Sequence, residues 1–250
     1  MQNKVRGIVL KKTKLAETDL IITLLCEDGS QLRAVAKSAR KPSSSFASRL
    51  ELFCLVEMLI AHGRNLAIVR EVKLIEPYTN IRGDVDKVSA VSPALELLAR
   101  TTRQDLPLPA LYSLTVSFLK EVNKIGDVLY DYLKVLCCAH LLKTCSYLGY
   151  RPNFTSCVLC GRERSLSSVD LPTPFSYTDG GLVCSHCANT EMSTVSQQAL
   201  LLSHQLIHTK FSEIALISTN TEAINQTLAF CKNWIIYHLD IKLRSLDLYL

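Results

Sequence analysis

Residues 20–36 read LIITLLCEDGSQLRAVA, two runs rich in Leu, Ile and Val separated by Asp28-Gly29. Asp-Gly between two apolar runs is a strong signal of a β-hairpin, because both residues tolerate the positive φ angles of tight hairpin turns. The stretch therefore predicts two paired strands, Leu20–Cys26 and Leu32–Ala36.

Three further apolar runs flank this hairpin, at Gly7–Lys11, Leu52–Ala61 and Leu66–Ile75. The last two are joined by His-Gly-Arg-Asn at residues 62–65, which is a second turn signal. Five short strands within about 75 residues favour a closed barrel, because closure leaves no unpaired strand edge. The long connection of residues 37–49, between the third and fourth strands, fits a barrel of the OB type.

The chain changes its period near residue 81, where helical spacing of apolar residues begins. Gly149 and then Pro152 follow one such segment, a pattern typical of a helix C-terminus. We predict an α+β protein, with an OB-type barrel domain at 1–80 and a helical domain at 81–250 that carries an insertion at about 151–190. The predicted helices are Val88–Arg100, Leu108–Lys124, Val128–Leu148 (the central, buried one), Thr194–His208 and Glu222–Ser245.

The predicted insertion holds two C-x-x-C pairs, Cys157 with Cys160 and Cys184 with Cys187, and 23 residues lie between the pairs. This is slightly longer than the ~15–20 residues common between zinc-binding pairs. Four thiolates complete a tetrahedral Zn²⁺ shell and leave no position for water or substrate. We therefore predict a zinc-ribbon-like insertion whose four cysteines bind one structural Zn²⁺ ion.

Other interpretations of these cysteines are a redox pair or four ordinary thiols, although chance rarely places two such pairs so close together. His186 lies inside the second pair and could replace a cysteine as ligand. Because four sulfurs already fill the shell, we expect His186 to be a loop residue that faces solvent. The remaining cysteines lie in apolar runs and are expected to be buried: Cys26, Cys54, Cys137, Cys138, Cys145 and Cys231.

The sequence contains no catalytic signature that we can name. A nucleobase deaminase needs H-x-E and P-C-x-x-C, yet no histidine is followed two residues later by Glu, and neither cysteine pair is preceded by Pro. H-E-x-x-H, G-x-S-x-G, the P-loop and G-x-G-x-x-G are also absent from the sequence. We predict that the protein is not an enzyme. The alternatives are a zinc-dependent nucleic-acid-processing enzyme and a protein-interaction adaptor without DNA binding.

The net charge of +5 is distributed unevenly along the chain. The first 50 residues contain ten Lys or Arg and four Asp or Glu, whereas the remaining 200 contain 18 and 19. All the excess positive charge therefore lies on the predicted barrel. Such segregation indicates a polyanionic partner for this region.

Residues 37–49 carry four cations and no acid, and a basic cluster follows the first strand. On a small barrel these form a groove for a phosphate backbone, although a solvated face is the simpler alternative. Residues 43–45 are serines that can donate to phosphate oxygens, and Phe46 either stacks on a base or, as is more common, anchors the loop to the core. The residues expected from charge alone to contact DNA are Arg33, Arg49, Lys11, Lys12 and Lys14.

Several short motifs follow one another in a characteristic order. The first half contains GIVLK at 7–11, E-x-D-x-x-x-T-L at 17–24 and AKSARKP at 36–42. The second half contains LGY-x-P at 148–152, C-x-x-C-G at 157–161, FS at 175–176 and GG-x-x-C-x-x-C at 180–187. In their order and spacing these motifs resemble the bacterial RecO family of recombination mediators, over nearly the whole chain.

The resemblance implies an N-terminal OB fold and a C-terminal helical domain with a zinc-binding insertion. It also implies binding to single- and double-stranded DNA, annealing of complementary strands, and action with RecR without catalysis. Together such proteins help RecA replace the single-strand binding protein SSB, whose acidic C-terminal tail is a further implied partner. Lys37, Arg40 and Lys41 occupy the family's basic motif, so the resemblance implies that these three contact DNA.

Ser38 departs from the family pattern, which usually has glycine between the Lys and Ala of the basic motif. If this position needs φ > 0, a serine there costs roughly 1–2 kcal/mol of backbone strain.

The first residues, MQNKVRGIVLKK, lack the features of a signal peptide, and no apolar run approaches the ~18 residues of a membrane span. We therefore expect a cytoplasmic, nucleoid-associated protein with no membrane partner and with reduced thiols.

Overall fold

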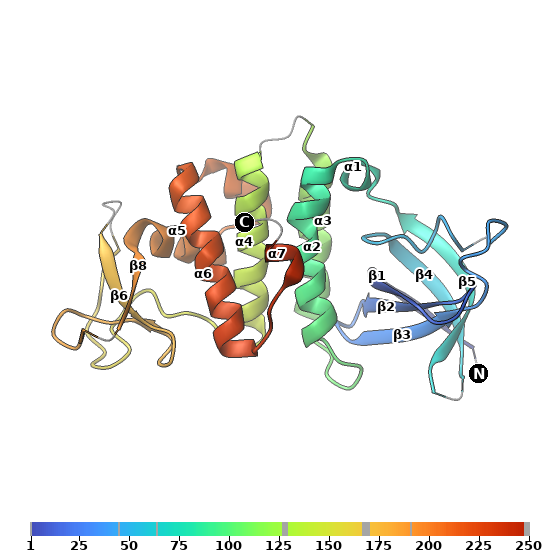
Figure 1. Cartoon of the computed structure of the whole chain (residues 1–250), viewed down its shortest axis with the longest axis horizontal. Coiled ribbons are helices and arrows are strands. Elements are labelled where there is room, and N and C mark those ends of the chain that lie inside the picture. The colour runs from blue at the N-terminus through green and yellow to red at the C-terminus, as the bar shows by residue number, and fades with distance from the viewer. Residues whose placement is uncertain are drawn as a thin grey trace. The chain divides into compact units, whose positions relative to one another are not determined.

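The computed structural model describes residues 2–44, 46–63, 65–126, 130–166, 171–190 and 192–247 (Figure 1). The chain forms two compact units, Met1–Lys124 and Ile125–Leu250. Three predicted positions lie outside the described residues: Ser45 in the basic loop, Arg64 in the second turn and Val128 at a helix start.

The first unit contains a closed barrel with the strand order β1-β2-β3-β5-β4 (Figure 1). The barrel closes through a short parallel pairing, in which Ala34 lies opposite Ala67 and Val35 opposite Ile68. All other neighbours pair antiparallel, and β1 is long enough to pair with both β2 and β4. The predicted OB-type barrel is confirmed. Its strands are β1 (Gln2–Lys14), β2 (Leu20–Cys26), β3 (Gln31–Ala36), β4 (Leu55–Ala61) and β5 (Ala67–Glu76).

The turn between β2 and β3 forms as its Asp-Gly pair predicts. Gly29 has φ +79°, and its N–H donates to the Cys26 carbonyl over 2.8 Å. A Cβ at this position would collide with the backbone of Leu108, so only glycine fits. Asp28 Oδ1 accepts the Ser30 N–H at 2.9 Å, which completes the turn.

Alternation along the strands separates two apolar surfaces. Val9, Leu24 and Met58 belong to the cluster that fills the barrel, and each is fully buried. Ile8 and Leu25 are register partners, also fully buried, but lie outside this cluster. Helix α2 (Val85–Thr101) packs against β1 and β2 and accounts for their burial.

Helix α2 is tied to the barrel by a polar contact as well. Gln31 Nε2 donates to the Ala99 carbonyl and to Thr102 Oγ1, each at 3.1 Å. The helices α1 (Thr79–Arg82), α2 (Val85–Thr101) and α3 (Pro109–Lys124) therefore belong to the same compact unit as the strands. The predicted boundary at residue 80 marks the change from strands to helices, and as a domain boundary it stays a prediction.

The second unit is a helical group with a small sheet of order β7-β6-β8. Helix α4 packs against both α5 and α6, and every residue from Leu133 to Leu142 is buried, as expected for a central helix. The helices are α4 (Tyr130–Tyr147), α5 (Gln197–His208), the 3-10 helix η1 (Phe211–Leu216), α6 (Thr221–Leu239) and α7 (Arg244–Asp247). The strands are β6 (Pro172–Ser176), β7 (Gly181–Leu182) and β8 (Ser193–Ser196).

Two of the predicted helices depart from their predicted bounds for reasons that the structure shows. Residues predicted to begin the helix at Thr194 form strand β8, which pairs with β6, and Ser196 Oγ then caps α5 by accepting the Ala199 N–H. The helix predicted to reach Ser245 ends at Leu239, because Asp240 takes up φ +52°. The described helices include none that is long and apolar enough to cross a membrane.

Candidate functional site

Both C-x-x-C pairs fold back as tight turns. The Gly161 N–H donates to the Cys157 carbonyl at 2.9 Å, and Gly161 has φ +73°, which favours glycine. In the second pair, the N–H groups of Cys187 and Ala188 donate to the Cys184 carbonyl at 3.0 and 2.9 Å. Each turn brings its two sulfurs to the same side.

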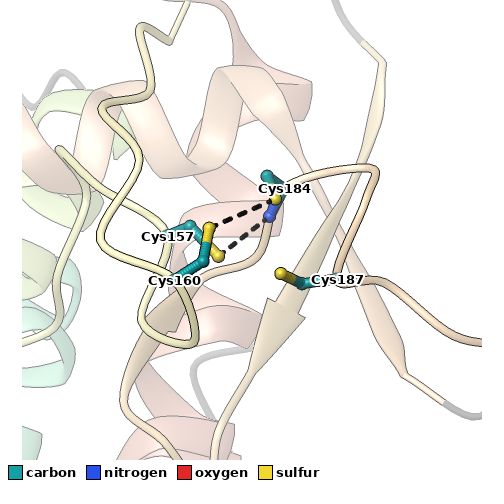
Figure 2. Close-up of side chains that lie close together, drawn as sticks. All are labelled: Cys157, Cys160, Cys184 and Cys187. Carbon is teal, nitrogen blue, oxygen red and sulfur yellow. Dashed lines mark hydrogen bonds between the residues drawn. The ribbon is translucent and has the colours of Figure 1, made fainter.

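The four sulfurs converge on one point (Figure 2). The Sγ atoms of Cys157, Cys160, Cys184 and Cys187 all lie within 4.8 Å of one another, and those of Cys160 and Cys184 are 3.7 Å apart. A tetrahedral ion with Zn–S bonds of about 2.3 Å requires sulfur–sulfur distances of about 3.8 Å. All four cysteines are free thiols. The predicted cluster therefore forms, and its donor set could hold a metal ion.

The sulfurs of the cluster differ in acidity, because they lie close enough to hydrogen-bond one another. The Cys184 N–H donates to Cys157 Sγ at 3.3 Å, and this hydrogen bond lowers the pKa of Cys157 to about 6. The Cys187 thiol donates a hydrogen bond to the neighbouring Cys184 sulfur, and this raises the pKa of Cys187 to about 12. Without a cation, four adjacent thiolates would repel one another; a bound metal removes that repulsion and deprotonates its ligands.

Backbone hydrogen bonds join the two turns into one module. The Val158 N–H donates to the Leu182 carbonyl at 2.9 Å, and the Leu182 N–H donates to the Asn153 carbonyl at 3.0 Å. A Cβ on Gly181 would lie 2.6 Å from the Asn153 carbonyl oxygen, so this close approach needs glycine. His186 is exposed and its Nδ1 lies 3.2 Å from an Arg162 guanidinium nitrogen, outside the sulfur cluster.

An aromatic cluster fixes the module to α6. The ring of Phe175 lies 5.3 Å from that of Phe230 and 5.9 Å from that of Trp234, both edge to face. Phe154 adds a third ring, 6.0 Å from Phe230. Trp234 is buried and donates its indole N–H to the Tyr150 carbonyl at 2.9 Å. The cysteine cluster is thereby coupled to the helical core of its unit.

Ser38, in the predicted basic loop, has φ +54°. The position does take up the left-handed conformation that favours glycine, so the serine carries strain of about 1–2 kcal/mol. Its N–H donates to Asp19 Oδ1 at 2.7 Å. A hydrogen bond to a charged acceptor contributes about 1.5–3 kcal/mol and offsets that strain.

Arg40 holds this loop against the connection between β1 and β2. Its N–H donates to the Thr18 carbonyl at 2.9 Å, and its Nη1 donates to the Ala16 and Glu17 carbonyls at 3.1 and 2.6 Å. Arginine has five N–H donors, so part of the guanidinium is available for a ligand. Arg40 therefore has a positioning role that the sequence did not reveal.

A hollow of about 430 Å³ brings the two predicted basic clusters together. Lys12 and Lys14 of β1 line it with Arg40 and Phe46 of the loop, and we call it the barrel hollow. Phe46 packs against the barrel core, which favours the anchoring interpretation. The Lys12 ammonium lies 2.8 Å from Glu51 Oε1, so this acid, two residues beyond the basic loop in sequence, partly neutralises the hollow.

The other predicted cations are spread more widely. Arg49 Nη1 donates to the Val72 carbonyl at 3.2 Å. Arg33 lines a separate hollow of about 300 Å³ with His62 and Asn65, near the turn between β4 and β5. Like Arg49, the predicted cations Lys11, Lys37 and Lys41 are exposed and line neither hollow.

The sequence matches two family descriptions that together span most of the chain. Residues 1–78 match "Recombination protein O N terminal", and residues 82–247 match "Recombination protein O C terminal". The chain belongs to the RecO family. Membership indicates a role in DNA repair and recombination, and the barrel of the first unit is the OB fold of this family.

Individual members of the RecO family align with nearly all of the chain. A DNA repair protein RecO of Bifidobacterium adolescentis is 31% identical over 253 residues, which cover 97% of this chain and 96% of the relative. The RecO protein of Caldanaerobacter subterraneus is 28% identical, over 98% of this chain and 96% of the relative. That of Syntrophomonas wolfei is also 28% identical, over 87% of this chain and 84% of the relative.

Proposed function

We propose that this protein is a non-catalytic mediator of recombination and repair that binds single- and double-stranded DNA through its barrel. The observation that carries the proposal is the barrel hollow, where Lys12, Lys14 and Arg40 converge from two separate segments. The exposed side chains of Lys37 and Lys41 extend the basic surface along the same loop. These cations bind phosphates and release counterions, which favours DNA of any sequence.

Annealing follows from the same electrostatics. Two complementary strands repel each other through their phosphates, and a basic surface that binds both lowers that repulsion. The phosphate contacts leave base edges free to pair. Family membership supports RecR, RecA and the SSB C-terminal tail as partners in this process, at a cytoplasmic, nucleoid-associated location.

We further propose that the four cysteines hold one Zn²⁺ ion in a structural role. Four sulfurs fill a tetrahedral shell, so no position remains for substrate. The ion would tie the two turns together and so hold Phe175 against α6. Under this proposal the cysteines stabilise the second unit and take no part in DNA chemistry.

An annealing assay tests the function. Two complementary oligonucleotides, each with one dye of an energy-transfer pair, should anneal faster with the protein, both bare and coated with SSB. Changing Lys37→Gln and Lys41→Gln together should slow annealing, whereas Lys120→Gln, an exposed lysine on α3, should not. Equal rates with and without protein would refute the mediator role. Cleaved or modified strands would instead support a zinc-dependent enzyme.

A further inference from the structure

Two adjoining hollows lie on the second unit, and no residue predicted to contact DNA lines either of them. The first, of about 420 Å³, is lined by Arg151, Phe154, His204 and His208, and we call it the histidine hollow. The second, of about 540 Å³, is lined by Tyr150 and Trp234 among others, and we call it the tyrosine hollow. Arg151 and Asn153 line both hollows and form their common wall.

Local structure fixes the residues of this wall. Helix α4 ends at Tyr147, Gly149 just after it has φ +93°, and the Tyr150 N–H reaches back to the Cys145 carbonyl at 2.8 Å. This is the hydrogen bond of a Schellman motif, and it directs the chain away from the helix at Arg151. His204 and His208 are one turn apart on α5, with ring centroids 5.0 Å apart. Arg151 Nη2 lies 2.7 Å from His208 Nε2.

The histidine hollow is electropositive. Burial and the Arg151 charge lower the pKa of His204. Burial, Arg151, His204 and Lys143 of α4 lower the pKa of His208. Among the described residues, no carboxylate is among the groups that shift either histidine, and none pairs with Arg151. His208 Nε2 accepts from Arg151 in this structure. Once protonated, the histidines donate instead, and an anion placed with Arg151 would raise both pKa values by offsetting the repulsion.

The tyrosine hollow offers aromatic surface beside this anion-binding set. Tyr150 is 39% exposed, so part of its surface is open to a ligand. Asp179 lines the tyrosine hollow and would repel a phosphate there, so the phosphate belongs in the histidine hollow. A ligand that suits both hollows has an anionic group next to a flat ring.

We propose that these hollows form a second contact for single-stranded DNA, with a backbone phosphate between Arg151, His204 and His208 and the adjacent base against Tyr150. The ligand class rests on the proposed function, because it is the same DNA that the barrel would bind. A nucleotide carries a phosphate and a stacking base at a short, fixed separation, and Arg151 stands between the two hollows that would hold them. Proton uptake by the histidines makes this contact tighter at lower pH.

Trp234 supplies a local readout, because it is the only tryptophan of the chain and lines the tyrosine hollow. We would titrate the full chain with a dye-labelled oligo-dT and follow both dye anisotropy, which reports all binding, and Trp234 emission. The oligonucleotide should change Trp234 emission in a saturable way. Arg151→Gln should weaken that local response by roughly five-fold and lower its salt slope by about 0.7, whereas Lys242→Gln on the same unit should do neither.

A pH series tests the histidines. Between pH 8 and 6 the affinity read from Trp234 should rise several-fold, and His204→Asn with His208→Asn should remove most of that rise. Affinity and not emission amplitude is compared, because the His238 ring lies 4.0 Å from that of Trp234 and can itself change the emission. Circular dichroism and melting of each variant confirm that the fold persists.

The outcomes separate this proposal from the function of the barrel. If anisotropy shows binding but Trp234 emission does not change and Arg151→Gln has no effect, the second contact is overturned and the barrel site is unaffected. A Trp234 response that survives Lys37→Gln with Lys41→Gln supports the second contact. If inorganic phosphate shifts the pKa values of the histidines and oligo-dT does not, the proposal is overturned in favour of a free anion. If an oligo-aspartate peptide competes as well as oligo-dT, the proposal is overturned in favour of an acidic peptide.

Discussion

The cysteine module and the barrel hollow differ in how their functional groups are held. The four sulfurs lie within 4.8 Å of one another, and their turns are fixed by backbone hydrogen bonds and by glycines. The cations of the barrel surface are spread over β1 and a long loop, and some already bind protein groups, as Lys12 and Arg40 do. A closed cluster suits a single ion and structural stability, whereas a spread of cations suits a long polyanion.

The largest expected effect comes from breaking the closed cluster. Cys184→Ser should lower the metal content and destabilise the second unit by at least about 3 kcal/mol, a modest part of the ~10–16 kcal/mol that structural zinc supplies to isolated zinc-finger peptides. Trp234 emission should shift to the red as Phe175 loosens. Metal analysis and thermal melting measure this, with Ser185→Ala in the same turn as control. An unchanged melting temperature in metal-free Cys184→Ser would contradict a structural role.

A pH effect should also single out the second unit. His140 of α4 is fully buried, and burial lowers its pKa from 6.5 to about 3. Between these values the unfolded chain binds more protons, so the stability present above pH 6.5 is lost as pH falls toward 3. We expect a loss of about 2 kcal/mol between pH 7 and 5.

Chemical denaturation of the unmodified chain and of His140→Gln, each at pH 7 and pH 5, isolates the contribution of His140 to the pH dependence of stability. The variant should be less stable throughout but depend less on pH. Equal pH dependence in the two proteins would show that His140 is not the group responsible.

The barrel loop should respond to relief of strain. Ser38→Gly removes a non-glycine residue from φ +54° and keeps the N–H that donates to Asp19. We expect the barrel to gain about 1 kcal/mol, because the strain of about 1–2 kcal/mol is partly offset by the greater freedom of glycine when unfolded. Denaturant unfolding measures the change, and a loss of stability would mean that the serine side chain itself supports the loop.

The smallest expected effect concerns the counter-charge of the barrel hollow. Glu51→Gln removes the acid that lies 2.8 Å from Lys12. Since an exposed ion pair contributes about 0–1 kcal/mol, freeing Lys12 should tighten DNA binding by at most about five-fold. Fluorescence anisotropy with Glu57→Gln as control tests this, and weaker binding by Glu51→Gln would exclude Lys12 from the DNA surface.

Features that depend on neighbouring residues were predicted from the sequence more successfully than features that depend on long-range contacts. The Asp28-Gly29 turn and the end of α4 just before Gly149 depend on neighbouring residues, and each forms as predicted. Strand β8 was missed because Ser193–Ser196 leads directly into α5 with no breaker, and its pairing partner β6 lies about twenty residues earlier. Nothing local indicates that Lys12 pairs with Glu51, 39 residues away.

Functional residues that depend on tertiary structure were missed for the same reason. The His204–His208 spacing of four residues is a visible signal of two rings on one helix face, but Arg151 joins them from a loop 57 residues before His208. Likewise, the sequence shows how many cations the barrel carries, but not that Arg40 is directed toward the carbonyls of Ala16 and Glu17.

The central claim is that DNA is bound by charge on the barrel while the cysteines serve only stability. The most direct test is the affinity for single-stranded DNA across a salt series, below the melting temperature of every protein used. Lys37→Gln with Lys41→Gln should reduce the slope of log K against log salt by about 1.4, at about 0.7 per lost phosphate contact, and Cys184→Ser should reduce it by no more than the about 0.7 of the single Arg151 contact. A slope near zero in the unmodified chain, or one lost in Cys184→Ser alone, would contradict the account.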